Sequence, residues 1–160
     1  MAFFRVKKIK GKEYAYIVEN KWKKGRSRQK VKGYMGRVYR FNLVNNVEFS
    51  QFKNIEDVQE YVKNNDKKKI INDMVEWELF KFGIKENFLV NDAKVQKGNK
   101  NVDFFINDGF MCNYTLKNII EFKSEGDEQS DGYRLARAFV EAGIKVPQEV
   151  FVGVFSKLFK

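Results

Sequence analysis

The chain has 160 residues, a formal net charge of +10 and a hydrophobic fraction of 43%, enough apolar side chain for one folded domain, or for a domain with a small module. It contains no histidine and a single cysteine, which excludes serine–histidine and cysteine–histidine catalysis, zinc sites of the Cys-His kind and an internal disulfide. No apolar run is long enough to span a membrane, the N-terminus lacks a signal-peptide core, and we therefore expect a soluble cytoplasmic protein.

The positive charge is concentrated in the first quarter of the chain. Residues 1–40 contain 14 Lys or Arg and 2 acids, whereas residues 41–160 contain 17 Lys or Arg and 19 acids. The densest stretch is KWKKGRSRQKVKGYMGR at 21–37, which holds eight basic residues, two aromatic rings and no acid. A compositional bias toward lysine would spread it evenly along the chain. The asymmetry instead indicates a surface for phosphates.

The basic segment is predicted to form three antiparallel strands at residues 3–9, 13–22 and 27–38. Glycine-centred turns, KGK and KKGR, separate these strands. Alternation places Arg28, Lys30, Lys32 and Tyr34 on one face of the third strand. The same rule groups Phe3, Arg5 and Lys7 on the first strand, and Tyr14, Tyr16, Val18 and Trp22 on the second. We expect a meander with one basic face, whose apolar face rests on the remainder of the protein.

Basic residues interleaved with aromatic rings are typical of nucleic-acid interfaces. Cationic groups release counterions from phosphates, and rings stack on unpaired bases. For the individual rings of Tyr14, Tyr16 and Trp22, a place in the core of the sheet is the alternative. The predicted nucleic-acid-binding residues are Arg5, Lys7, Trp22, Lys23, Lys24, Arg26, Arg28, Lys30, Lys32, Tyr34 and Arg37.

The pattern of residues 3–38 resembles a known nucleic-acid-facing module. An Arg-containing strand, a GK-x-Y turn, a V-E strand and an R-Q-K-V…Y-x-G-R strand follow in the order found at the N-terminus of IS1634/IS4-like transposases and of small archaeal proteins of unassigned function. The matching residues are Arg5, Gly11, Lys12, Tyr14, Val18, Glu19, Gly25, Arg28, Gln29, Lys30, Val31, Tyr34, Gly36 and Arg37. The resemblance covers about a quarter of the chain and implies binding to DNA or RNA. No set of acids after residue 41 matches the transposase catalytic domain, so transposition is not implied.

After a junction at residues 41–53, the pattern predicts two helices. The first follows Asn54 as its N-cap, and the second follows Asp66 and ends at Gly83. Glu78 falls within the apolar stripe of the second helix, where a carboxylate needs a partner. We expect that partner to be Lys81 or a basic residue from the sheet.

The rest of the chain is predicted to contain a β-hairpin and further helices. Residues 87–95 and 102–108 read as the two strands of the hairpin, joined by a turn at 96–101. A helix over residues 131–143 is followed by an amphipathic C-terminal helix that starts at Pro147, with a strand at 150–155 as the alternative. The apolar residues of that last helix are Val150, Phe151, Val154, Phe155, Leu158 and Phe159.

Four residues form the only catalytic pattern in the sequence. Glu78 on a helix, Asp103 on a strand, and Glu121 and Lys123 in IIEFK weakly resemble the PD-(D/E)XK nucleases, in which such residues hold Mg²⁺ and activate water. That arrangement requires residues 117–123 to form a strand beside Asp103. The same stretch also reads as a helix capped by Thr115, and with a helix there the nuclease site could not form.

The sequence therefore predicts an α+β protein with two parts: a basic β-meander module at 1–41 that binds nucleic acid, and a scaffold domain at 42–160 that contains a β-hairpin and four to five helices. The expected function is non-catalytic nucleic-acid binding without cofactor or metal, with RNA favoured over DNA and a ribosome or another ribonucleoprotein as a possible setting. The alternatives are a Mg²⁺-dependent nuclease and a protein–protein adaptor that binds its partner through the C-terminal helix.

Overall fold

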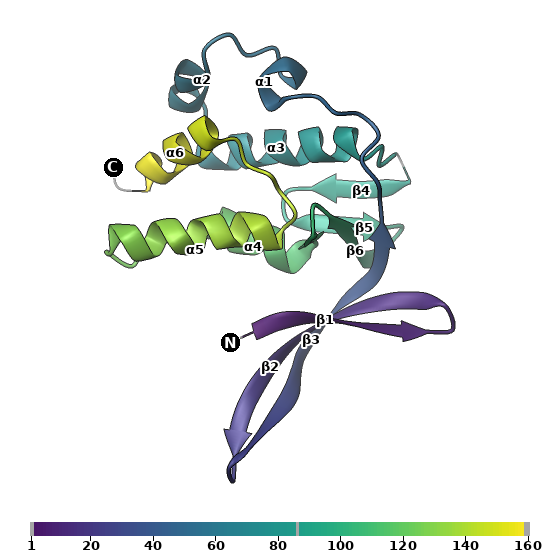
Figure 1. The fold of residues 1–160 in the computed structure, drawn as a ribbon. Helices are drawn as coiled ribbons and strands as arrows, with labels where there is room; N and C mark the ends of the chain where they lie inside the picture. The colour runs from purple at the N-terminus through teal and green to yellow at the C-terminus, as the bar shows by residue number, and fades with distance from the viewer. Residues whose placement is uncertain (1, 86, 159–160) are drawn as a thin grey trace.

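A sheet of seven strands and six helices make up the described part of this chain, residues 2–85 and 87–158 of a computed structural model. The strands are β1 Ala2–Ile9, β2 Lys12–Lys23, β3 Arg26–Arg40, β4 Phe88–Asn91, β5 Lys94–Lys97, β6 Lys100–Ile106 and β7 Gly109–Met111. The helices are α1 Phe49–Phe52, α2 Val58–Asn64, α3 Lys67–Lys81, α4 Asn113–Ile120, α5 Glu128–Glu141 and α6 Gln148–Lys157. The α+β class and the N-terminal meander are confirmed. Figure 1 shows the helices gathered with β4–β6 in one body, from which β1–β3 extend.

Strands β1, β2 and β3 pair antiparallel in sequence order. The two turns between them are short, and each places a lysine and a glycine at positive φ: Lys10 at 51° and Gly11 at 79°, then Lys24 at 53° and Gly25 at 76°. Two successive positive φ values characterise the type I′ turn, whose twist matches that of the flanking strands. The glycine-centred turns therefore lie where the sequence predicts them.

Two β-bulges in β3 change which side chains share a face. Lys30 pairs with Glu19 whereas Tyr34 pairs with Tyr16, and register shifts lie between Ala15 and Tyr16 and between Ile17 and Val18. Because neighbours on a strand alternate between faces, Tyr34 and Lys30 lie on opposite faces of the sheet. The prediction that Arg28, Lys30, Lys32 and Tyr34 share one face is therefore wrong. A prediction that assumes strict alternation of side chains misses an extra residue in one strand.

The C-terminal end of β3 joins the meander to the rest of the sheet. Residues Arg37–Arg40 pair in parallel with Val102–Phe105 of β6, giving the strand order β1-β2-β3-β6-β5-β4. Gly36 lies where the two strands begin to pair, with φ of 108°, and a Cβ there would lie 2.3 Å from the backbone oxygen of Asn101. One sheet therefore contains strands from both sides of residue 41, where the boundary between the two parts was expected.

The region predicted as one hairpin, residues 87–108, contains three short strands, and β7 follows it. Besides Gly98, tight turns form at Asp92, with φ of 55°, and at Asn107 and Asp108, with φ of 49° and 60°. Asn and Asp tolerate the left-handed region better than other non-glycine residues. These turns let β4, β5, β6 and β7 pair in succession. The turn at Asp92 divides the predicted strand at 87–95, and the turn at Asn107 and Asp108 ends the predicted strand at 102–108 after Ile106.

The helix ends follow the capping chemistry in part. Asp66 caps α3 by accepting a hydrogen bond from the Lys69 N–H, and Gly83 follows its last turn at φ of 62°, as expected. Helix α2 begins after Asp57, whose carboxylate accepts from two backbone N–H groups, so the predicted cap at Asn54 is wrong. Helix α4 begins at Asn113 after Cys112, which places Thr115 inside the first turn instead of at the cap.

The C-terminal segment is a helix, as predicted, and its apolar side packs inward. Val150 and Val154 are buried, and Phe151, Phe155 and Leu158 pack against the core, while Phe159 lies outside the described residues. Pro147 is the N-cap of α6 and not its first helical residue. The apolar face proposed for a protein partner is thus largely occupied by the protein's own core.

Candidate nucleic-acid interface

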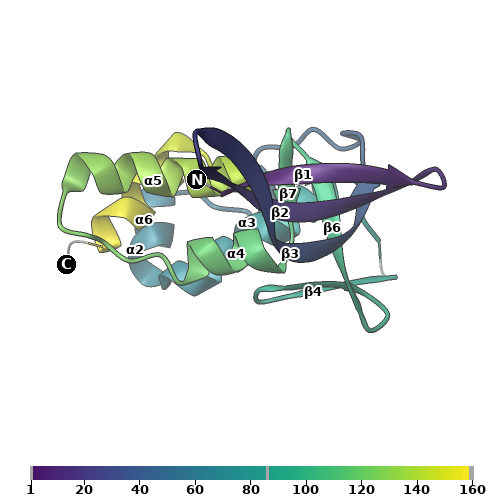
Figure 2. The same cartoon turned by 90° about the horizontal axis from the view of Figure 1, so that it is seen from below.

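The end of the β2–β3 hairpin, residues 20–32, projects from the molecule as a two-stranded ribbon, here called the hairpin tip. Every residue in it is exposed, and it points away from the helical body in Figure 1, so that in the view from below it lies in front of that body (Figure 2). It contains seven Lys or Arg and no acid. Among the described residues, Lys32 is the member of this set with an ion pair, to Glu19 at 3.0 Å. The other six cations keep their charge open to solvent.

Like charges face each other across the hairpin tip. Lys21 pairs with Arg28, and Lys23 pairs with Arg26, so each pair shares one face of the ribbon. Like charges directly opposite each other destabilise a sheet. The tip thus keeps an arrangement that costs stability and that a bound polyanion would relieve.

The opposite face of the tip carries the exposed tryptophan. Trp22 pairs with Ser27, and its side chain is 78% exposed, the most exposed among the large hydrophobic residues that the structure describes. Its place in the core of the sheet, considered as an alternative, is therefore excluded. An indole ring in water on a basic ribbon is available for stacking.

The three tyrosines of the meander form a cluster beside cations. The Tyr16 and Tyr34 rings lie 5.2 Å apart, the Tyr14 and Tyr34 rings 6.3 Å apart, and the Lys7 Nζ lies 5.0 Å from the Tyr16 ring centre. Arg5 donates a hydrogen bond to Gln29 Oε1. Tyr34 remains 55% exposed, although partial burial together with its tyrosine neighbours raises its pKa. The predicted stacking residue Tyr34 is thus accessible, and Tyr14 and Tyr16 are half-buried.

A pocket of about 470 Å³ lies where the meander meets β5 and β6, and we call it the tyrosine pocket. Its volume falls in the range of small-molecule sites. Among the residues that the structure describes, four cations and three tyrosines line it, and no acid does. The lining residues are Lys12, Tyr14, Tyr34, Gly36, Arg37, Tyr39, Lys97, Lys100, Asn101 and Val102.

Arg37 is one of the cations that line this pocket. Its guanidinium carbon lies 4.8 Å from the Tyr39 ring centre, and Lys97 approaches the same ring at 5.2 Å. The Arg37 Nε is shielded from solvent and has no hydrogen-bond acceptor within residues 2–85 and 87–158. A buried donor without an acceptor is costly unless a ligand or water supplies one.

The acids of the larger part do not neutralise this surface in the described structure. Arg40 forms a two-pronged bond to Glu13, with 2.6 Å between Nε and Oε1, and that bond lowers the pKa of Glu13. Both this acid and Glu19 belong to the meander itself. The remaining ion pairs lie within the helical body and in the link from Lys68 to Asp92.

Sequence reasoning missed Lys12, Lys97 and Lys100 as site residues. Lys97 and Lys100 lie within the predicted turn at 96–101 and look like ordinary surface lysines. They reach the meander because β6 pairs in parallel with β3. Parallel pairing between distant segments leaves no local signal in the sequence, so the pocket could not be predicted.

Two residues of the nuclease pattern, Glu78 and Asp103, are buried in the core. Glu78 is fully buried, with its Oε1 2.6 Å from the Lys81 Nζ and its Oε2 accepting a hydrogen bond from Asn107, which confirms Lys81 as its partner. Asp103 is also fully buried, and neither of its oxygens has a hydrogen-bond partner among the described residues. Burial raises the pKa of Asp103 to about 8, opposed by the neighbouring Cys112 thiol, whose own pKa burial raises to about 12.

The other two residues of the pattern lie on a helix end and a loop. Glu121 is the C-cap of α4, and Lys123 follows in the segment before α5, so the strand that the nuclease pattern requires beside Asp103 is not formed. Within the described residues no group of three or more His, Cys, Asp or Glu could hold a metal ion.

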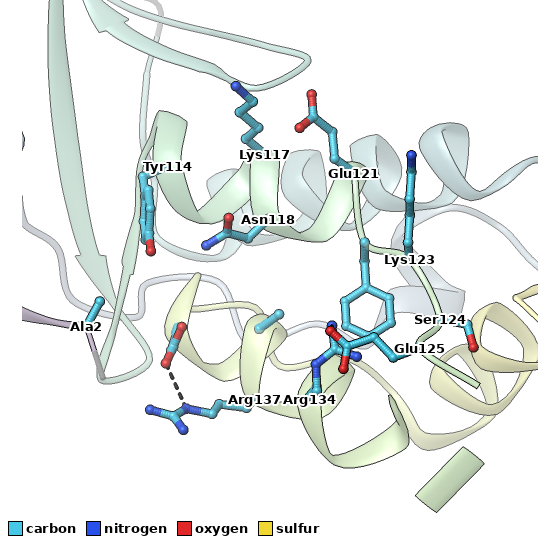
Figure 3. A pocket seen from close by; sticks show the side chains of 13 residues that line it. Ala2, Tyr114, Lys117, Asn118, Glu121, Lys123, Ser124, Glu125, Arg134 and Arg137 are labelled. Atoms are coloured by element: carbon cyan, nitrogen blue, oxygen red, sulfur yellow. Dashed lines mark hydrogen bonds and ion pairs between the residues drawn. The ribbon is translucent and has the colours of Figure 1, made fainter. Parts of the chain in front are cut away.

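Glu121 and Lys123 instead line a cavity of about 750 Å³ beside α4 and α5 (Figure 3). The cavity mixes both signs of charge: Arg137 pairs with Glu141 at 2.9 Å, and Arg134 pairs with Glu125 at 3.6 Å. Cations that are matched by acids in this way offer little to a phosphate. Its charge differs from that of the tyrosine pocket, where the part of the chain that the structure describes contributes no acid.

No protein family, curated protein or solved structure matches this chain. In the part of the chain that the structure describes, no helix has the length and apolar character to cross a membrane.

Proposed function

We propose that this protein binds nucleic acid without catalysing a reaction, using the hairpin tip and the tyrosine-bearing surface of the meander, and that it favours RNA over DNA. The observation that carries the proposal is the exposed ribbon with seven basic residues, of which one has an ion pair among the described residues. A solvated surface would gain nothing from like charges held opposite each other at Lys21–Arg28 and Lys23–Arg26.

The aromatic side chains support single-stranded or looped targets. Trp22 and Tyr34 are both more than half exposed, and rings of this kind stack on unpaired bases. Unpaired bases are abundant in folded RNA, which is the reason for preferring RNA. A cytoplasmic ribonucleoprotein would supply such a target, and a small basic protein suits that setting.

The proposal is tested by measuring affinity for short single-stranded RNA, duplex RNA and duplex DNA by fluorescence anisotropy at several salt concentrations. The logarithm of the association constant should fall linearly with the logarithm of salt concentration, by roughly 0.7 per phosphate contacted on a single strand. The double variant Arg28→Glu with Lys30→Glu should lose at least about tenfold in affinity, because two attractive charges become repulsive.

The matched control is Lys63→Glu with Lys145→Glu, which makes the same change in net charge at two exposed lysines outside the sheet. It should retain nearly all the affinity. Equal losses of affinity in both double variants would show that net charge alone drives binding. Binding that does not depend on salt would show that contacts to phosphates do not contribute.

A further inference from the structure

We infer that the tyrosine pocket receives one unpaired nucleotide of the bound strand, with its base against Tyr34 and its phosphate against Arg37, Lys97 and Lys100. This inference rests on the proposed function and adds to it a specific subsite. It implies that the protein binds the unpaired bases of a single strand as well as its phosphates.

The lining of the pocket matches the two chemical halves of a nucleotide. Tyr14, Tyr34 and Tyr39 supply ring faces for a base, and Tyr34 is 55% exposed. Base stacking on an aromatic side chain tolerates any base, because every base has a π face. The ring cluster therefore predicts binding of a base with little sequence preference.

The charge in the pocket is unbalanced in the way a phosphate would correct. Lys12, Arg37, Lys97 and Lys100 line it, and none of its described lining residues is an acid. The shielded Nε of Arg37 lacks an acceptor among the described residues, so the pocket holds a donor that a phosphate oxygen could satisfy. Guanidinium groups bind phosphate with fixed geometry, which favours Arg37 as the main contact.

The pocket also lies on the path that a strand bound to the hairpin tip would follow. Trp22 of the tip and Tyr16 lie on the same face of β2, and Tyr16 pairs with Tyr34 of the pocket. Arg28 and Lys30 pair with Lys21 and Glu19 on the opposite face. A single strand that stacks on Trp22 can therefore continue along this face of the meander into the pocket, whereas a duplex cannot insert a paired base.

The test uses a short single-stranded RNA that carries one 2-aminopurine, and the same RNA annealed to its complement. Binding of the single strand should quench 2-aminopurine fluorescence, because the base stacks on a ring. Tyr34→Ala should remove the quenching and weaken single-strand binding about 5- to 150-fold, the range expected for loss of one stacked base. Affinity for the duplex should not change.

Two further variants guard against effects on folding. Tyr34→Trp keeps a stacking surface and should retain affinity, and Lys97→Ala with Lys100→Ala alters only exposed side chains at a turn and should weaken single-strand binding. Tyr133→Ala removes an exposed ring from α5 and serves as the matched control that leaves binding intact.

The outcomes separate this inference from the proposed function. If single-strand affinity depends on Arg28 and Lys30 but not on Tyr34, Lys97 or Lys100, the pocket inference is overturned and the proposed function stands. If the unaltered protein binds none of the RNA or DNA probes, both are overturned.

Discussion

Asp103 is a carboxyl group in the middle of the core, and it makes folding sensitive to pH. Its pKa is about 8 in the folded protein, raised by burial from an ordinary value of 3.8. Between these two values the folded state keeps a proton that the unfolded state releases. The stabilising effect is complete below pH 3.8 and is lost as the pH rises through 8, at about 1.4 kcal/mol per pH unit.

Asp103→Asn should remove this pH dependence. The free energy of unfolding of the variant, relative to the unaltered protein, should rise by about 3–4 kcal/mol from pH 5 to pH 8. Urea unfolding at the two pH values, followed by circular dichroism, measures the change. A difference between the two proteins that is the same at pH 5 and pH 8 would mean that Asp103 is ionised in the fold.

Fluorescence emission from the two tryptophans reports separately on the candidate interface and on the core. Trp22 is 78% exposed on the hairpin tip, whereas Trp77 is 6% exposed and donates a hydrogen bond to the Val47 carbonyl. Addition of single-stranded RNA should quench Trp22 emission, and Trp22→Phe should abolish the change while Trp77 still emits. Trp22→Ala should weaken binding by about 1–3 kcal/mol if the ring stacks on a base. Quenching that persists in Trp22→Phe would place the ligand elsewhere.

At the scale of elements, Gly36 decides whether β3 can join β6. An alanine there would be strained at φ of 108°, and its Cβ would lie 2.3 Å from the Asn101 backbone oxygen. Gly36→Ala should destabilise the protein by about 2–4 kcal/mol. Gly33→Ala is the control, since its Cβ would meet only the flexible end of Met35 at 3.0 Å. Thermal unfolding of both variants measures the difference in stability. Equal losses of stability would argue against close packing of Gly36 on the Asn101 backbone.

The outer part of the hairpin tip, residues 21–28, should be removable without loss of the fold. Asn20 and Gln29 are paired, so replacing residues 21–28 with Asn-Gly leaves a two-residue hairpin with a favoured type I′ turn. The shortened protein loses five Lys or Arg and should unfold within about 1 kcal/mol of the original, because every removed residue is exposed. Its affinity for RNA and the salt dependence of binding should both fall. Unchanged affinity would assign binding to the rest of the surface.

These elements were partly predictable from local chemistry. Turns centred on Gly11 and Gly25, the Asp66 cap and the stop at Gly83 are read directly from residue types with known backbone preferences. The bulges in β3 and the turns at Asp92 and Asn107 were missed, because non-glycine turn residues and extra residues in a strand give weaker signals.

For the whole molecule, the α+β class and the exposure of the basic ribbon follow from the sequence, and the shape of the site does not. Charge counts along the chain locate the hairpin tip, because charged side chains without acids nearby stay in water. The tyrosine pocket depends on Lys97 and Lys100 reaching Arg37, which only the three-dimensional pairing of β3 with β6 brings about. Sequence patterns report which residues are near in the chain, and this pocket unites residues that are far apart in it.

The parallel ladder between β3 and β6 also has a consequence for biosynthesis. A ribosome completes β1, β2 and β3 well before it adds the residues of β6, so one edge of β3 emerges with its hydrogen-bonding groups unpaired. Such an edge invites association between nascent chains. Arg37 and Arg40 lie along it, and their mutual repulsion between copies would protect the half-made sheet from aggregation until its partner strand arrives.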